Sequence, residues 1–183
     1  ELVNAKPDDM IIVSDLDEIP NLEKIDLRKI SKKLIFFKQK FFCYKLNLIY
    51  AEMPWWGSKA CKKKYLKSPQ WLRSIKNKKY PIWRLDALFS KKKYNDIQFV
   101  IDGGWHFTNV RDSKDLEKKL LNFLHHIDFE HSGLNANDLK KLINEKKVMY
   151  NHNIDSKRTE HDKWGEGKKL QKIKFEEMPK YII

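Results

Sequence analysis

Short apolar runs separated by polar residues dominate the first hundred positions and predict β-strands. Residues 10–13 form a β-branched run between polar neighbours, which is typical of a buried strand. Residues 34–37 and 41–50 also predict strands, the second with alternating apolar and polar positions, and a turn at residues 38–40 would join them as a hairpin. A further strand is expected over residues 96–102.

Helical signals are strongest in the second half of the chain. Over residues 113–126, apolar side chains recur at helical spacing and charged ones occupy the opposite face, and a second amphipathic helix starts near Asn135. Residues 68–77 predict another helix, because they open with Ser-Pro and proline is favoured at the first helical position. Asn21 is a candidate N-cap for a short helix, and the polar residues 151–169 predict a loop.

Composition indicates one folded core. The 183 residues are 41% hydrophobic and 13% aromatic, which argues against disorder although 34% are charged. This length is enough for a single core and does not require two domains. No apolar stretch approaches the roughly 20 residues needed to cross a bilayer, so no membrane span is expected.

The first residues and the two cysteines allow predictions about processing of the chain and about its cellular compartment. Residues 1–4 lack the features of a secretory signal, and there is no initiator methionine, so we expect a fragment or a processed product. Cys43 and Cys61 have no metal-binding spacing and predict buried thiols, with a single disulfide as the alternative. Free thiols indicate a reducing compartment, and the expected location is cytoplasmic or at the membrane periphery.

The formal net charge of +13 comes mainly from lysines, because only five of the 38 basic residues are arginines. Specific recognition of phosphates and bases relies on the planar guanidinium group. The charge is therefore weak evidence for specific nucleic-acid recognition. Non-specific attraction to phosphate or to an anionic membrane surface is expected at low salt.

Three acidic residues, Asp15, Asp17 and Glu18, follow the strand expected at residues 10–13. Open α/β sheets bind ligands beyond the carboxyl ends of their strands, and residues two apart in an extended chain project to the same side. Asp15 and Asp17 are thus expected to face one point. Two hard oxygen donors suit Mg²⁺ or Mn²⁺, which substrate phosphates commonly complete. The alternative interpretation is a solvated acidic turn.

Further motifs favour the metal-site interpretation. Residues 103–108 (Gly-Gly-Trp-His-Phe-Thr) follow the strand expected over residues 96–102, and residues 55–57 (Trp-Trp-Gly) lie in a predicted loop. With residues 15–20 (Asp-Leu-Asp-Glu-Ile-Pro) and the closing residues 178–181, this order of motifs resembles glycosyltransferase family 17. The best-known members of that family are β-1,4-mannosyl-glycoprotein N-acetylglucosaminyltransferases.

The resemblance covers nearly the whole chain and implies a GT-A-like α/β fold, with a mixed sheet flanked by helices. It also implies an inverting mechanism, a UDP-sugar donor, with N-acetylglucosamine as the expected sugar, a glycan or glycoconjugate acceptor and a divalent cation. We expect one glycosyltransferase domain over residues 1–183. GT-A folds bind the nucleotide base on strands ahead of the acidic motif, and only 14 residues precede Asp15. The N-terminal strands are therefore expected to be missing.

The resemblance also assigns roles to residues of the acidic and histidine motifs. Asp15 is expected to lie near the donor's ribose and the cation, and Asp17 to be a ligand of the cation. His106 is expected to contact the cation or the diphosphate, with a core histidine as the alternative interpretation. If the strands that precede Asp17 and His106 are neighbours in one sheet, the two side chains can converge on one cation. Glu18 either orients the acidic turn by hydrogen bonding, which we prefer, or acts as a base.

Other candidates concern the acceptor and the donor. An inverting transferase needs a carboxylate to deprotonate the acceptor hydroxyl, and the sequence does not choose among several. Arg73 or Arg84 is expected to contact the donor diphosphate. The candidate bases are Glu18, Asp102, Asp128 and Glu130.

Three tryptophans in predicted loops, Trp55, Trp56 and Trp105, are candidate sugar-binding residues. Indole rings stack on the apolar C–H faces of sugars, whereas packing in the hydrophobic core is the alternative for each.

Two other functions fit parts of the sequence. A basic, aromatic-rich module that binds nucleic acid or anionic glycans without catalysis would lose affinity for DNA steeply with salt and ignore Mn²⁺. A metal-dependent hydrolase or nucleotidyltransferase would use the same aspartates.

Overall fold

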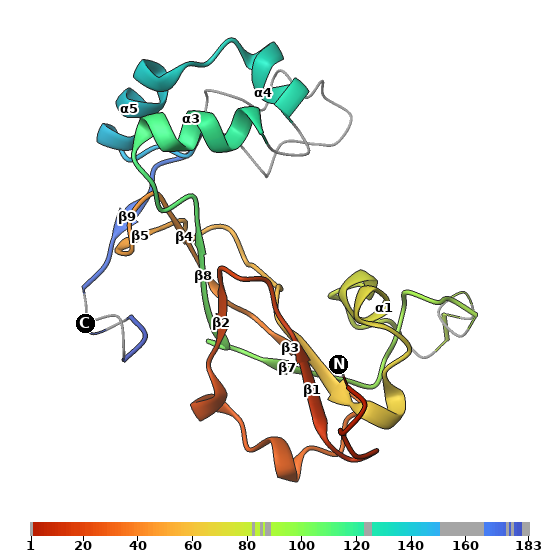
Figure 1. The fold of residues 1–183 in the computed structure, drawn as a ribbon. Coiled ribbons are helices and arrows are strands. Elements are labelled where there is room, and N and C mark those ends of the chain that lie inside the picture. Colours follow the sequence, from red (N-terminus) through yellow and green to blue (C-terminus); the bar gives the residue numbers. More distant parts are fainter. Residues whose placement is uncertain are drawn as a thin grey trace. The chain divides into compact units, whose positions relative to one another are not determined.

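The computed structural model describes residues 2–81, 83–84, 86, 89–122, 126–150, 167–174, 176 and 178–180 (Figure 1). This part of the chain is a mixed α/β structure with a four-stranded sheet, a five-stranded sheet and four α-helices. Contacts divide the chain into two compact units. Unit 1 comprises Glu1–Lys40 and Pro54–His106, and unit 2 comprises Phe41–Met53 and Phe107–Ile183. The α/β class expected from the sequence is confirmed.

The four-stranded sheet belongs to unit 1 and has the strand order β1-β6-β3-β7. β6 runs antiparallel to both β1 and β3, whereas β3 and β7 are parallel. β1, β3 and β7 lie where apolar runs predict strands. β6 was not predicted, because its sequence Lys-Ala-Cys-Lys lacks branched and aromatic residues. The bounds are β1 (Met10–Val13), β6 (Lys59–Lys62), β3 (Leu34–Phe37) and β7 (Ile97–Val100).

The five-stranded sheet has the order β2-β8-β4-β5-β9. β2 and β8 are antiparallel, and their register sets Glu18 opposite His106 and Pro20 opposite Gly104. This pairing joins the acidic motif to the histidine motif. The bounds are β2 (Glu18–Pro20), β8 (Gly104–Thr108), β4 (Lys40–Cys43), β5 (Leu48–Ile49) and β9 (Gln171–Lys172).

The prediction of a hairpin over residues 34–50 is wrong, because β3 and β4 belong to different sheets. Residues 41–50 do not form one strand either. Tyr44 has a left-handed φ of 68°, and Lys45 N donates to Cys43 O, so the chain turns between β4 and β5. A left-handed tyrosine is uncommon, and hydrophobic alternation gives no sign of it.

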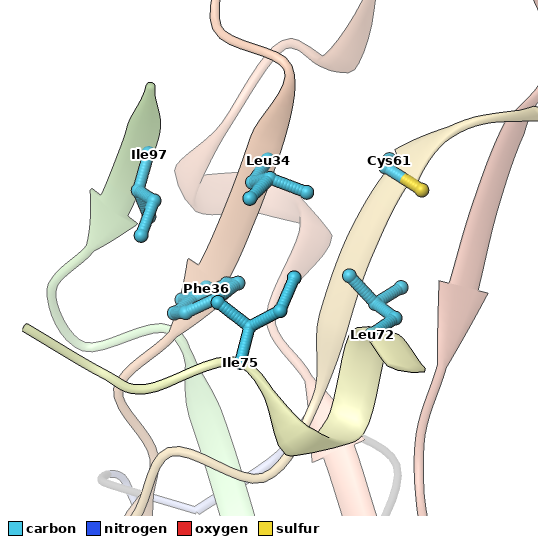
Figure 2. Packing of buried hydrophobic residues seen from close by; sticks show 6 residues of the cluster. All are labelled: Leu34, Phe36, Cys61, Leu72, Ile75 and Ile97. Atoms are coloured by element: carbon cyan, nitrogen blue, oxygen red, sulfur yellow. The ribbon is translucent and has the colours of Figure 1, made fainter. Parts of the chain in front are cut away.

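The core of unit 1 packs both faces of β3, whose residues alternate between them. On one face, α1 (Pro69–Ser74) and the residue after it bring Leu72 and Ile75 against the sheet. The helix starts as expected, with Ser68 accepting a hydrogen bond from Trp71 N, but it ends before Asn77. Figure 2 shows this cluster, formed by Leu34, Phe36, Cys61, Leu72, Ile75 and Ile97. The opposite face buries Ile35, Phe37, Ala60 and Val100.

Unit 2 contains α3 (Ser113–Leu121), α4 (His126–Ser132) and α5 (Ala136–Asn144). The predicted helix over residues 113–126 ends early, and His126 instead opens α4; residues 123–125 lie outside the described residues. The helix predicted near Asn135 is confirmed. Asn135 accepts from Asp138 N and Asp138 accepts from Asn135 N, which forms a capping box.

Asn21 caps a 3₁₀ turn, η1 (Leu22–Lys24), by accepting from Glu23 N. Cys43 and Cys61 are free and buried, as predicted. Of the loop predicted over residues 151–169, residues 151–166 lie outside the described part. Among the helices that the structure describes, none is both long and apolar enough to cross a membrane. Two further 3₁₀ turns are η2 (Leu27–Lys29) and η3 (Lys63–Tyr65).

Candidate functional site

The acidic motif forms a tight turn between β1 and β2. Glu18 N donates to Asp15 O over 3.1 Å, which closes the turn. The side chains of Asp15 and Asp17 are 41% and 39% exposed, and Leu16 between them is fully exposed. The two aspartates are therefore open to a ligand from solvent.

The structure brings His106 to Asp17, with 3.3 Å between His106 Nε2 and Asp17 Oδ2. The route differs from the expected one. The strands that precede the two residues, β1 and β7, lie at opposite edges of the four-stranded sheet. The pairing of β2 with β8 makes the contact instead, because it sets His106 opposite Glu18, the neighbour of Asp17.

The spacing of these two donor atoms fits a shared divalent cation. Ligand atoms about 2.1 Å from one ion and at right angles lie about 3 Å apart. The same distance also fits a direct hydrogen bond from His106 Nε2 to Asp17 Oδ2. Asp17 and His106 could hold Mn²⁺ or Mg²⁺ once the cation replaces the proton between them, with other positions left for phosphate oxygens and water. Asp15 turns to Arg73 instead, and no cluster of three or more potential ligand residues is found in the described part of the chain.

Burial favours the neutral form of His106. The side chain is buried, and this burial lowers its pKa below the ordinary value, although the nearby carboxylates of Asp17 and Glu18 act in the opposite direction. The Trp55 indole covers the imidazole, with ring centroids 4.5 Å apart and planes 23° apart. A neutral imidazole has a lone pair available for coordination.

The Glu18 side chain connects the acidic turn to Trp55 through hydrogen bonds. One carboxylate oxygen, Oε1, accepts from Trp55 Nε1 over 2.7 Å. The other, Oε2, accepts from Asp15 N over 3.0 Å. The carboxylate of Glu18 therefore fixes both the acidic turn and the indole that covers His106, which favours the orienting role over that of a base.

Small polar residues surround the Glu18 carboxylate. The hydroxyls of Ser14 and Ser58 lie 2.6 Å apart, and each is 3.4 Å from Glu18 Oε2. Gln39 Nε2 donates to Ser58 Oγ over 2.8 Å. Gly57 completes the arrangement, because a Cβ there would lie 1.8 Å from Glu18 Oε1. Any larger residue at position 57 would displace the carboxylate.

Arg73 forms an ion pair with Asp15 of the acidic turn. Its Nη1 donates to Asp15 Oδ1, and its Nη2 donates to Asp15 Oδ2 over 2.8 Å. Lys59 lies behind it and donates to the carbonyls of Arg73 and Ile75 over 2.8 and 2.6 Å. Burial lowers the pKa of Lys59 to about 8, helped by the positive charge of Arg73.

The remaining candidates for donor or acceptor binding are Trp56, Trp105 and Arg84. Trp56 packs edge-on against Phe99, with ring centroids 5.0 Å apart, at the margin of the core. Trp105 is half-buried on β8. Arg84 pairs with Asp86.

Two candidate bases are carboxylates outside the turn. Asp102 is exposed, with a left-handed φ of 51° just after β7. Asp128 lies on α4, in unit 2. Both stay predictions, as does Glu130 on the same helix.

Four supporting residues were not predicted from the sequence: Ser14, Gln39, Ser58 and Lys59. Each acts through a partner that is distant in the sequence; Ser14 and Ser58, for example, are 44 residues apart. The one available signal is Gly57 beside Ser58, since glycine often marks a close approach.

Comparison of the chain with family models, curated proteins and solved structures finds no match. The resemblance to glycosyltransferase family 17 therefore depends on the motifs alone.

Proposed function

We propose that this chain belongs to a metal-dependent, inverting glycosyltransferase with a GT-A-like fold. It would move a sugar, with N-acetylglucosamine the leading candidate, from a UDP-sugar to a glycan acceptor. The observation that carries the proposal is the 3.3 Å approach of Asp17 Oδ2 to His106 Nε2. Two separate motifs that resemble one family supply these atoms, and their spacing suits a shared cation.

Each residue has a distinct task in this proposal. Asp17 and His106 would hold the cation, which when bound stabilises negative charge on the departing diphosphate. Glu18 keeps the acidic turn and the Trp55 indole in place through its hydrogen bonds. Arg73 has the bidentate geometry that suits a phosphate.

The acceptor hydroxyl must lose its proton to a carboxylate. Glu18 is buried, and both of its oxygens already accept hydrogen bonds, so it is the weakest candidate base. Asp102, Asp128 and Glu130 remain the better candidates.

The test is UDP release by the complete enzyme from a panel of UDP-sugars, with and without Mn²⁺. Asp17→Asn should abolish the Mn²⁺-dependent rate, and His106→Ala should reduce it at least tenfold while the protein stays folded. The matched controls are Asp115→Asn and His131→Ala, which change exposed residues on α3 and α4 and should leave the rate unchanged. Indifference to Mn²⁺, together with salt-sensitive DNA binding, would contradict the proposal.

A further inference from the structure

We propose that Arg73 is a receptor for a diphosphate and that Asp15 occupies it while no ligand is bound. The diphosphate takes the place of the Asp15 carboxylate on the guanidinium, and Asp15 is released toward Asp17. The identity of the diphosphate, as part of a nucleotide-sugar, rests on the proposed function. The exchange itself rests on the contacts of Arg73, Asp15 and Lys59.

The first support is the geometry of the Arg73–Asp15 pair. Two guanidinium N–H groups point at the two oxygens of one carboxylate. A guanidinium binds carboxylate and phosphate through the same pair of parallel hydrogen bonds. Asp15 therefore stands in for two phosphate oxygens, and the site that it fills is already shaped for an anion.

The second support is that the pair is open to exchange. The side chains of Arg73 and Asp15 are 44% and 41% exposed. Pairs this exposed stabilise a protein by only about 0–1 kcal/mol, because water and salt screen them. A ligand with several negative charges competes well against one carboxylate bound this weakly.

The third support is that hydrogen bonds hold the backbone at Arg73 and at Asp15. Only the two side chains need to move when the diphosphate replaces the Asp15 carboxylate. Lys59, which is buried, holds the carbonyl of Arg73 and that of Ile75. Figure 2 shows Leu72 and Ile75, on either side of Arg73 in the sequence, packed in the core. On the other side, Glu18 holds Asp15 N. The backbone at Arg73 therefore keeps its position after Asp15 leaves, and the guanidinium stays within reach of the same place.

The exchange couples binding of the diphosphate to binding of the cation. While Arg73 holds Asp15, this carboxylate is unavailable to a cation beside Asp17. A diphosphate on Arg73 frees Asp15 and so raises cation affinity, and by thermodynamic reciprocity the cation raises diphosphate affinity by the same factor.

The test uses pyrophosphate as the probe, with a chelator present, and measures its affinity by calorimetry in a double-mutant cycle. Asp15→Asn removes the competitor and should tighten pyrophosphate binding about fivefold, which corresponds to about 1 kcal/mol for the exposed pair. Arg73→Ala should weaken binding at least tenfold. In the Arg73→Ala background, Asp15→Asn should have no effect.

The cycle separates exchange from simple charge repulsion. If Asp15→Asn tightens binding equally with and without Arg73, the effect is the general field of the aspartate and the proposal is wrong. No tightening in the wild-type background, or no loss with Arg73→Ala, also overturns it. Arg28→Ala, which breaks another exposed arginine–aspartate pair, Arg28–Asp26, is the matched control and should leave affinity unchanged. Because no cation and no sugar are present, these results do not depend on glycosyl transfer.

Discussion

Trp55 is half-buried, and its indole contacts His106 on one face and Glu18 through its N–H. The sequence predicts this residue as a sugar-binding surface. The contacts add a second role, in which the ring excludes water from the imidazole. Both roles require the indole, so substitutions at this position must be designed to separate them.

Substitution of Trp55 should change the pKa of His106. Trp55→Ala uncovers the imidazole, and because burial is what lowers this pKa, the pKa should rise toward the ordinary histidine value. Trp55→Phe retains a ring over His106 and should leave the pKa nearly unchanged. NMR titration of His106 measures the shift. Trp83→Ala is the control, since Trp83 is 82% exposed; an unchanged pKa in Trp55→Ala would contradict this account.

Lys59 should make stability depend on pH in a defined window. Its pKa is lowered from 10.5 to about 8 in the folded protein, so between these values the unfolded chain binds more protons. Stability therefore rises with pH across this window, and the cost of burying the charge, fully present below pH 8, disappears above pH 10.5. The lowering corresponds to about 3 kcal/mol.

Lys59→Met isolates this contribution. The variant lacks the titrating group, so the stability of the wild-type protein relative to the variant should increase by about 3 kcal/mol between pH 8 and pH 10.5. Urea unfolding at several pH values measures the difference. A difference that stays constant with pH would show that Lys59 has an ordinary pKa.

At the scale of elements, the pairing of β2 with β8 brings His106 to Asp17, and Gly104 makes the pairing possible. Gly104 has a φ of 137°, and a Cβ there would lie 2.1 Å from Ile19 O and 2.9 Å from Asn21 N. Such contacts with backbone atoms cannot be relieved by moving a flexible side chain. The chain must therefore keep glycine here to keep the two motifs together.

Gly104→Ala should separate β2 from β8 and so destabilise the protein and weaken Mn²⁺ binding. Gly133→Ala is a matched control, because Gly133 also has a positive φ, 68°, but a Cβ there meets no atom within 4 Å. The control should cost only about 1–2 kcal/mol, the strain of a left-handed alanine. Urea unfolding and Mn²⁺ titration of both variants test this; equal effects would show that the strand contact is not critical.

Local sequence signals predict some elements well and miss others for physical reasons. β1 and β3 follow from compact apolar runs, and the starts of α1 and α5 follow from their capping residues. β6 escapes prediction because Lys59 looks like a surface residue. The Lys59 side chain can be buried because its ammonium group donates hydrogen bonds to two backbone carbonyls that lie 14 and 16 residues away.

At the scale of the whole molecule, the chain forms two compact units, and the arrangement around Asp17 lies within unit 1. The expectation of one glycosyltransferase domain over residues 1–183 stays a prediction. Five separated segments supply the side chains around the acidic turn. Motif order predicts that Asp17 and His106 work together, but the contact depends on strand pairing over long sequence distances. The five segments are residues 14–18, 39, 55–59, 73 and 104–106.

The measurement that tests the central claim most directly is pulsed EPR of Mn²⁺ bound to the protein in the presence of UDP. If Asp17 and His106 share the cation, the spectrum should contain the coupling of a directly coordinated imidazole nitrogen. His106→Ala should remove that coupling, and Asp17→Asn should weaken Mn²⁺ binding at least tenfold, whereas His131→Ala should change neither. Tight Mn²⁺ binding without nitrogen coupling, or coupling that survives His106→Ala, would contradict the account.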